Sequence, residues 1–300
     1  MTGSGNWVRG VGVPLAVSKA LVLLVAAITI ALLVPGVSPL SVPRQLVQWD
    51  AQSYLTIAQH GYPTSPGYLD AFLPGFPLLV RAASVLTRDY IAASLVVSLV
   101  AEALALWFFW RLVRAERDPA GARFCVLLLA FFPTAVFLTA PFTEAPFIAA
   151  AAAGLFYARQ GRALPAAVAA ACAVSMRLSG LALLPALGLE VWMRSGLRKP
   201  SQALTLLLVP LPLVLYCAYM AAHTGDGLAL FHAEASPSFG QALTPPWSGL
   251  ATTWQTMATA TDGEVRSIFA REIAFGLLGF VACVAMWLSR RIPRAFTLYC

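Results

Sequence analysis

Residues 14–34 read PLAVSKALVLLVAAITIALLV, an apolar run in which Lys19 is the one charged residue. An α-helix of about 20 residues crosses the roughly 30 Å hydrocarbon core of a bilayer, so this run predicts a transmembrane helix. The run is long for the apolar part of a signal peptide, and the next residues, PGVS (35–38), make a poor cleavage site. These features favour an uncleaved membrane anchor over a cleaved signal peptide.

The composition indicates that the rest of the chain is membrane-embedded too. Of the 300 residues, 59% are hydrophobic and 11% are charged, and the mean hydropathy is +0.76, which excludes a water-soluble globular protein. With residues 14–34, we predict an all-α, polytopic transmembrane protein with about eight spans. The further apolar runs that predict spans are residues 90–110, 122–140, 145–158, 164–176, 178–192, 203–222 and 273–289.

The distribution of positive charge predicts the orientation. The net charge is +7, and the basic residues lie in short segments beside apolar runs, as in a membrane protein rather than one that binds nucleic acid. Residues 71–86 are interrupted by Pro74, Pro77 and Arg81, which favours an interfacial or re-entrant segment. In that case 14 of the 20 basic residues face the cytoplasm. They are Arg9, Lys19, Arg111, Arg114, Arg117, Arg123, Arg159, Arg162, Arg194, Arg198, Lys199, Arg290, Arg291 and Arg294.

This topology predicts a single membrane domain over residues 1–300. Its parts are a first span (14–34), an extracytoplasmic loop with interfacial helices (35–89), a helical bundle (90–222), a second extracytoplasmic loop (223–272) and a last span (273–289). Long ordered loops tend to carry function, so both loops are candidates for a site. The five cysteines are far apart and mostly inside apolar runs, which predicts packing roles rather than a metal or redox site.

A short amphipathic helix is predicted in the first loop, within QWDAQSYLTIAQHGY (48–62), with Gly61 as its C-terminal stop. Asp50 shares a face of this helix with Tyr54, so a carboxylate and a phenol point the same way. A carboxylate at a membrane interface can act as a general base toward a hydroxyl group. On spacing alone, an Asp stabilised by the dipole in the first helical turn is the more frequent explanation.

Four tracts in order carry a family resemblance. They read WDAQSYL (49–55) through HGY (60–62), AFLPGFPLL (71–79), FPTAVF (132–137) through TEAPF (143–147), and SMRLSG (175–180). They resemble the PIG-V mannosyltransferases, which add the second mannose in the assembly of GPI anchors and have bacterial relatives of unassigned acceptor. The likeness covers about residues 45–190 and is fairly specific, since several tracts recur in order.

The resemblance implies a GT-C glycosyltransferase, a multi-span protein that uses a polyprenyl-phosphate sugar at the extracytoplasmic face. In that fold the first outer loop carries the catalytic carboxylate, which is the position of Asp50. The predicted topology independently places Asp50, Glu144 and Arg177 on one side of the membrane. We therefore expect Asp50 to be the catalytic base, polyprenyl-phosphate mannose to be the donor, and a glycan, lipid or protein to be the acceptor. The expected location is a bacterial cell membrane, or the endoplasmic reticulum membrane in a eukaryote.

The remaining candidate residues are expected to bind substrate. Arg177, between two apolar runs, can stabilise the departing lipid phosphate, and its alternative role is a structural pair with Glu144. Glu144 can orient sugar hydroxyls or hold Arg177, or simply cap the helix that follows. Weaker candidates, which an interfacial aromatic belt or headgroup contacts would also explain, are Trp49, Tyr54, His60, Tyr62 and Arg81.

No cofactor and no metal are expected, because arginine can neutralise a monophosphate leaving group. His223, Asp226, His232 and Glu234 lack metal-ligand spacing, and a solvated loop explains them better. Members of the family usually continue past this length, so the resemblance implies a chain that is short at its C-terminus. A second membrane subunit is then one candidate partner. A noncatalytic partner subunit of a transferase is therefore one alternative. A transporter of lipid-linked sugars is another, but it predicts related halves and a midplane polar site that the sequence lacks.

Overall fold

The computed structural model describes residues 8–34, 36–38, 41–195, 200–237, 239 and 245–289. Every regular element within those ranges is a helix, which confirms the predicted all-α class. The chain divides into two compact units, residues 1–233 and 234–300. Several basic residues assigned above to the cytoplasmic face lie outside the described residues: Arg198, Lys199, Arg290, Arg291 and Arg294.

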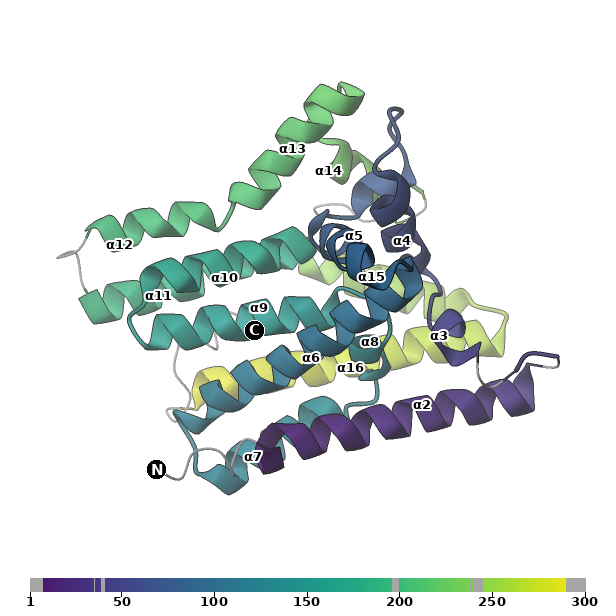
Figure 1. Ribbon diagram of the computed structural model, residues 1–300, viewed down its shortest axis with the longest axis horizontal. Coiled ribbons are helices and arrows are strands. Elements are labelled where there is room, and N and C mark those ends of the chain that lie inside the picture. The colour runs from purple at the N-terminus through teal and green to yellow at the C-terminus, as the bar shows by residue number, and fades with distance from the viewer. Residues whose placement is uncertain are drawn as a thin grey trace. The chain divides into compact units, whose positions relative to one another are not determined.

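The first unit is a helical bundle in which α9 packs between α6 and α10 (Figure 1). The helices up to the boundary are η1 (Val8–Gly12), α2 (Val13–Leu33), α3 (Val42–Gln45), α4 (Asp50–His60), η3 (Tyr68–Ala71), α5 (Gly75–Thr87), α6 (Tyr90–Arg114), α7 (Pro119–Ala130), α8 (Val136–Thr139), α9 (Glu144–Arg159), α10 (Ala163–Met176), η4 (Leu178–Ala182), α11 (Leu183–Ser195), α12 (Pro200–Leu204), η6 (Thr205–Leu208), α13 (Leu211–Thr224) and α14 (Ala229–Glu234).

Four segments are long and apolar enough to cross a membrane: Val8–Leu33, Tyr90–Arg114, Gln202–Thr224 and Gly263–Leu288. The other predicted spans form shorter helices, of which α9 is the longest with 16 residues. A helix of that length extends only about 24 Å, less than the hydrocarbon core. The described helices therefore provide four candidate spans, and the expected number of about eight is not confirmed.

The predicted span over residues 122–140 is wrong, because α7 ends at Ala130 and the chain is irregular before α8. Pro133 lies in this break, and a proline cannot donate the backbone hydrogen bond that a continuous helix requires. A second break follows α8 and lasts until α9 begins at Glu144. We call residues 131–143 the linker; it connects α7 to α9.

The predicted helix in the first loop is confirmed as α4, which ends where Gly61 adopts a φ of 79°. After it, α5 has 13 residues, which fits an interfacial or re-entrant segment better than a span. Gly75 at the start of α5 lies against the end of α10, where a Cβ atom would lie 2.6 Å from the carbonyl oxygen of Ser175. A glycine is thus required for the two helices to approach this closely.

Small side chains fill the interface between α9 and α10, which form an antiparallel hairpin. A Cβ atom on Gly154 would lie 3.4 Å from the carbonyl oxygen of Ala166, so the backbones are close. Such small-residue interfaces let helices pack without a bulky apolar side chain between them. The buried alanines of the two helices are Ala145, Ala149, Ala151, Ala152, Ala153, Ala158, Ala163, Ala166, Ala167, Ala170 and Ala173.

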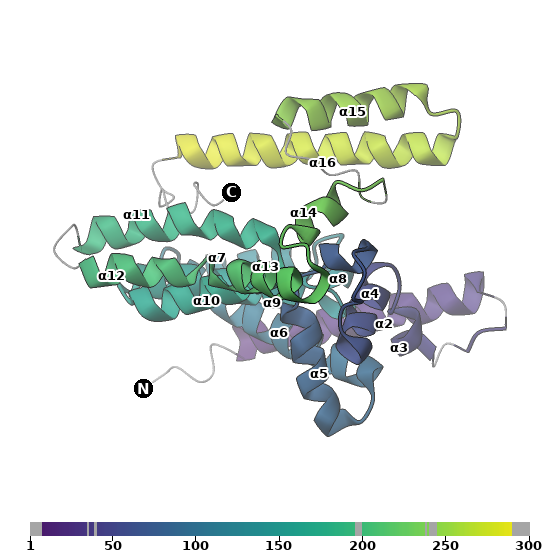
Figure 2. The same ribbon diagram turned by 90° about the horizontal axis from the view of Figure 1, so that it is seen from above.

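In the second unit, α15 (Pro246–Thr259) and α16 (Gly263–Leu288) pack side by side (Figure 2). The predicted last span began at Ile273, but α16 begins ten residues earlier, where Asp262 accepts a hydrogen bond from the backbone N–H of Glu264. A side-chain acceptor before the first turn is a common helix start. The second loop predicted over residues 223–272 therefore contains helices, and the single membrane domain over residues 1–300 remains a prediction.

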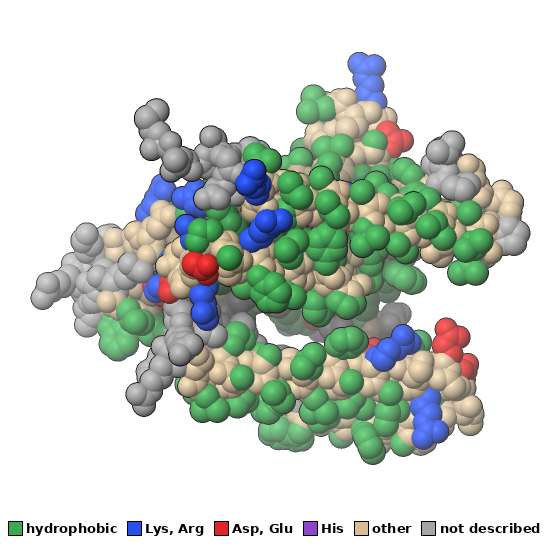
Figure 3. Space-filling model, turned by 90° about the horizontal axis from the view of Figure 1, so that it is seen from below, with side chains coloured by type: hydrophobic (Ala, Val, Ile, Leu, Met, Phe, Trp, Pro, Cys, Tyr) green, Lys and Arg blue, Asp and Glu red, His purple; other side chains and the backbone are tan. Residues whose placement is uncertain are grey.

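Apolar side chains are exposed along the candidate spans, for example Leu24, Leu32 and Leu33 of α2. Hydrophobic side chains cover much of the face drawn in Figure 3, and charged side chains are few there. Soluble monomers rarely expose apolar areas this large. The surface is consistent with a lipid environment.

Candidate active site

The candidate base Asp50 is the first residue of α4, and it follows a strained residue. Trp49 has a φ of 51° and a ψ of −127°, a backbone conformation that is costly for any residue except glycine. Strain of this kind is of order 1–3 kcal/mol and persists only where the surroundings enforce it. The strain at Trp49 therefore marks the start of α4 as a place where the position of the next residue matters.

An arginine and a glutamate meet at the open ends of the α9–α10 hairpin. Arg177 follows α10, and its Nη1 atom donates to Glu144 Oε1 at 2.6 Å and to Thr143 Oγ1 at 3.3 Å. The Arg177 side chain is 44% exposed, so part of the guanidinium group faces out of the bundle. An arginine held on one side by a carboxylate can still offer its remaining N–H groups to an anion.

Tyr54 connects α4 to this pair. Its hydroxyl group lies 3.5 Å from Thr143 Oγ1, and its ring makes edge contacts with Phe72 and Phe76. Tyr54 is one helical turn from Asp50, so the two side chains share a face, as the sequence predicts. The structure therefore gathers Tyr54, Glu144 and Arg177 around Thr143, and Asp50, one turn before Tyr54, interacts electrostatically with Tyr54 and Arg177.

Electrostatics couples the members of this group. Partial burial raises the pKa of the Asp50 carboxyl above its usual value, and the positive charge of Arg177 opposes part of that shift. Burial also raises the pKa of Tyr54 to about 12, so its phenol stays protonated at neutral pH. A carboxylate with a raised pKa beside a cation is a proton acceptor next to an anion site, which is an arrangement suited to group transfer.

Thr143 is a residue that the sequence did not single out as part of the site. Its hydroxyl group lies between the Tyr54 hydroxyl and the Arg177 guanidinium, and the residue is 1% exposed. The available signal was its place directly before Glu144 in the third tract of the resemblance. A buried hydroxyl with two polar neighbours fixes both of them, so Thr143 links the first loop to the hairpin.

Trp49 lies beside this group, toward the linker. Its side chain is 74% exposed, and its ring centroid lies 6.5 Å from that of Phe137 in α8. Phe137 in turn makes an edge contact with Phe142 at 5.0 Å. Trp49 therefore contacts the linker and presents most of its indole ring to the surroundings, where a sugar or lipid can reach it.

Three other candidates lie at the opposite end of α4, about 15 Å along the helix from Asp50. His60 is exposed at the last residue of α4. Tyr62 donates its hydroxyl to the carbonyl oxygen of Phe72 at 2.6 Å, and its backbone carbonyl lies 2.9 Å from His223 Nε2. Arg81 donates from Nε to the carbonyl oxygen of Ala58 at 2.6 Å. The structure does not bring these residues to the Asp50 group.

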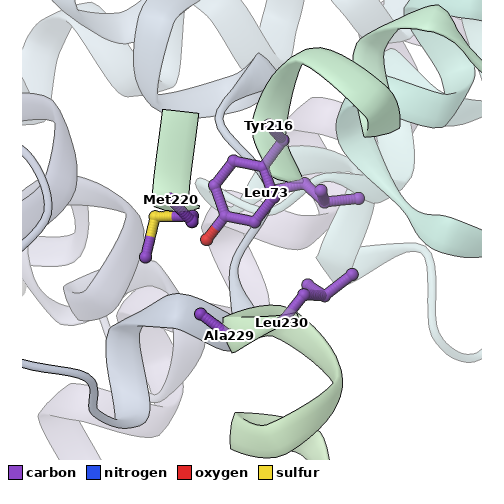
Figure 4. Close-up of a cluster of buried hydrophobic side chains, with 5 residues drawn as sticks. All are labelled: Leu73, Tyr216, Met220, Ala229 and Leu230. Carbon is purple, nitrogen blue, oxygen red and sulfur yellow. The ribbon is translucent and has the colours of Figure 1, made fainter. Parts of the chain in front are cut away.

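Tyr62 and Arg81 instead line a cavity of about 450 Å³ between α5 and α13. Beside it, Tyr62 lies 5.4 Å from Tyr216, centroid to centroid, and packs on the buried cluster drawn in Figure 4. That cluster joins Leu73 before α5 to α13 and α14, and its members are Leu73, Tyr216, Met220, Ala229 and Leu230. The cluster holds the end of the first loop against α13.

No group of three or more metal-binding side chains was found in the described part of the chain. Of the histidines considered above, His232 pairs with Asp226, whose Oδ2 atom lies 2.7 Å from Nδ1, and His223 contacts a backbone carbonyl. The imidazole of His232 and a backbone N–H hold the pKa of the exposed Asp226 below its usual value. His232 and Asp226 thus contact each other near α14, whereas His223 connects α13 to the first loop.

Comparison with known proteins identifies a family. A family model described as mannosyltransferase (PIG-V) matches residues 25–194. No curated protein and no solved structure matches the chain. The matched range includes Asp50, Thr143, Glu144 and Arg177, together with all four tracts that carry the resemblance.

Proposed function

This chain belongs to the mannosyltransferase (PIG-V) family, and from that premise we propose that it transfers mannose from a polyprenyl phosphate to an acceptor at the extracytoplasmic face of a bacterial cell membrane. The acceptor is lipid-linked or protein-bound, and the architecture is of the GT-C type. The observation that carries the proposal is the meeting of Asp50, whose pKa is raised, with the Arg177–Glu144 pair. A transferase of this kind needs a proton acceptor and a phosphate-binding cation in one site.

In the proposed reaction, the Asp50 carboxylate accepts the proton of the acceptor hydroxyl as that oxygen attacks the anomeric carbon of the mannose. The bond from the anomeric carbon to the phosphate oxygen breaks, and its electron pair leaves with the polyprenyl phosphate. The configuration at the anomeric carbon is inverted, because attack and departure take place on opposite faces. Asp50 later releases its proton to solvent.

Arg177 stabilises the charge that gathers on the departing phosphate, and its planar fork suits a bidentate contact with two phosphate oxygens. Glu144 holds the guanidinium from the other side at 2.6 Å, which limits its orientations. Tyr54 and Thr143 fix the separation between base and cation. A monophosphate carries too little charge to require a divalent ion in addition to arginine, so we expect activity in the presence of a chelator.

The test is transfer of radiolabelled mannose from synthetic polyprenyl-phosphate mannose into a membrane lipid and protein extract by the purified full chain in lipid nanodiscs. Asp50→Asn keeps the shape of the side chain and removes the base. Asp89→Asn is the matched control, because Asp89 is exposed and accepts a hydrogen bond from Ala92 N, which Asn also accepts.

We expect transfer by the native chain and by Asp89→Asn, and loss of at least a hundredfold in kcat for Asp50→Asn, on the scale of about 10²–10⁴ for a general base. Equal activity of Asp50→Asn and the native chain would exclude Asp50 as the base. Absence of transfer by the native chain alone, with transfer restored by a co-purified second membrane protein, would favour the noncatalytic partner subunit.

A further inference from the structure

Serine side chains of α2 and α6 donate hydrogen bonds to the backbone at or beside the linker. Ser18 Oγ donates to the carbonyl oxygen of Ala130 at 2.7 Å, directly before the linker. Ser98 Oγ donates to the carbonyl oxygen of Ala140 at 3.1 Å. Lys19 Nζ donates to Thr139 Oγ1, the hydroxyl at the end of α8. Two candidate spans therefore supply hydrogen-bond partners for the linker, which is irregular on both sides of α8.

Lys19 reaches Thr139 as a member of an ion pair with Glu102 of α6. The Glu102 side chain is fully buried, and both residues lie in helices long and apolar enough to cross a membrane. Charged groups within a span are costly even when paired, and apolar side chains of the same volume often pack as well. Packing of α2 on α6 therefore does not by itself account for the pair.

The linker that Lys19 contacts forms one wall of the candidate active site. Ala140 and Phe142 pack on Ala51, the residue after Asp50, in one buried cluster. Phe137 contacts the strained Trp49 that precedes Asp50. The linker thus touches the residues on both sides of the candidate base.

The far end of the linker is the other half of the site. Its last residue, Thr143, contacts Tyr54 and Arg177, and Glu144 follows directly. Thr143 lies four positions after Thr139, where the ammonium group of Lys19 is bound. A shift of the linker at Thr139 therefore moves Thr143 relative to Asp50.

We propose that Lys19, held by Glu102, is a positioning residue for the transfer reaction: by binding Thr139 it fixes the linker, and so sets the distance between Asp50 and the Thr143–Glu144–Arg177 group. The inference rests on the function proposed above. Displacements near 1 Å at a reacting centre can lower a rate by about a hundredfold, so a contact remote from the substrate can control kcat. Lys19 touches no substrate in this scheme.

The experiment separates positioning from stability. Thr139→Val removes the hydroxyl that Lys19 binds, keeps the side-chain shape and leaves the ion pair in place. Lys19→Met/Glu102→Met removes both charges at similar volume, so no unpaired charge is buried. The control is Thr252→Val in α15, where the threonine hydroxyl donates to the carbonyl of Ser248 in its own helix. For each variant, kcat and KM for polyprenyl-phosphate mannose, the thermal unfolding temperature and amide hydrogen exchange of residues 136–143 are measured.

Positioning predicts a fall in kcat on the order of tenfold in Thr139→Val and in the double variant, with KM for the donor unchanged and native kcat in Thr252→Val. The variant that combines Thr139→Val with Lys19→Met/Glu102→Met should lose no more kcat than either alone, because both sets of changes break the same contact. If Lys19→Met/Glu102→Met unfolds and native kcat is found in Thr139→Val, the proposal is overturned. Native kcat in a folded double variant overturns it as well.

Hydrogen exchange gives a result that does not depend on transfer. If the native chain transfers no mannose, the proposed function fails, and exchange in the linker then decides the positioning role by itself. Faster exchange over residues 136–143 in Thr139→Val, with no change in Thr252→Val, supports it. Unchanged exchange there contradicts it.

Discussion

The guanidinium group of Arg177 lies 2.6 Å from the carboxylate of Glu144, although 33 positions separate the two residues. Residues 160–162 connect α9 to α10 at the closed end of the hairpin. Glu144 and Arg177 lie at the opposite, open end, one on each helix terminus. The pair is half-exposed, so it adds little to the stability of the fold. Its effect is on the orientation of the arginine.

Glu144→Gln should therefore lower kcat/KM rather than the thermal unfolding temperature. Glutamine keeps the shape but not the charge, so Arg177 is held less firmly, and kcat/KM should fall roughly fivefold, which is about 1 kcal/mol of transition-state stabilisation. Initial rates against donor concentration measure it. Glu264→Gln, an exposed change in the first turn of α16, is the control. An unchanged kcat/KM in Glu144→Gln would show that the pair is only structural.

The pH profile tests the electrostatic link between Asp50 and Arg177. The charge of Arg177 opposes the rise in the pKa of Asp50, so Arg177→Met should raise that pKa further. Asp50 must be deprotonated to accept a proton, hence activity falls as pH decreases through its pKa. The acidic limb of kcat/KM against pH should move to higher pH in Arg177→Met and stay in place in Arg177→Lys. An acidic limb that does not move would mean that another group controls it.

Asp50→Asn should raise the thermal unfolding temperature at neutral pH, although it lowers the rate of transfer. The pKa of Asp50 is raised in the folded chain, so folding favours the protonated form, and the charged form present at neutral pH opposes folding. The stabilising contribution of the protonated group is complete below the ordinary pKa of aspartate and is lost as pH rises through the raised value. The difference in unfolding temperature between variant and native chain should therefore shrink at acidic pH. A lower unfolding temperature for Asp50→Asn at neutral pH would contradict this.

The strain at Trp49 predicts that glycine is better tolerated there than alanine. Both substitutions remove the indole contact with Phe137, but only glycine adopts a φ of 51° without cost. Trp49→Gly should be more stable than Trp49→Ala by about 1 kcal/mol. Denaturant unfolding of both variants, followed by the same probe, provides the measurement. Equal stability would mean that the backbone relaxes when the indole is gone.

Arg81→Gln should lower stability without raising KM for the donor. The guanidinium group donates to the carbonyl oxygens of Ala58 and Ile57 at 2.6 and 3.4 Å, near the C-terminal end of α4. Loss of these charged hydrogen bonds should cost about 2 kcal/mol. Thermal unfolding and KM are measured on the same preparation. A higher KM with an unchanged unfolding temperature would instead assign Arg81 to the lipid phosphate.

Much of this arrangement follows from local sequence rules. The glycine stop at residue 61 and the shared face of Asp50 and Tyr54 depend on helical periodicity alone, and the structure confirms both. The match over residues 25–194 confirms the family resemblance that the four tracts carry. These features could be predicted because each depends on residues close together in the chain.

Other features were missed, because hydropathy and tract membership do not report backbone breaks, distances along a helix or contacts between distant segments. Hydropathy treats residues 122–140 as one run, but it does not register the hydrogen bond that is lost at Pro133. His60, Tyr62 and Arg81 belong to the same tracts as Asp50, yet the length of α4 separates them from it. Thr143 precedes Glu144 in the third tract, but its role becomes clear only from its contacts with the distant Tyr54 and Arg177.

The alanine-filled interface between α9 and α10 has a consequence for how this protein can vary. The two helices are joined at residues 160–162, and Glu144 and Arg177 lie at their other ends. A change in the spacing of the helices therefore changes the separation of these two residues. Where the two backbones are close, as at Gly154 and Ala170, an added methyl group must be accommodated by moving the helices apart. Substitution of the small residues at this interface is therefore limited by the geometry that Glu144 and Arg177 require. A larger side chain on one helix is tolerated chiefly when a smaller one replaces its neighbour on the other helix.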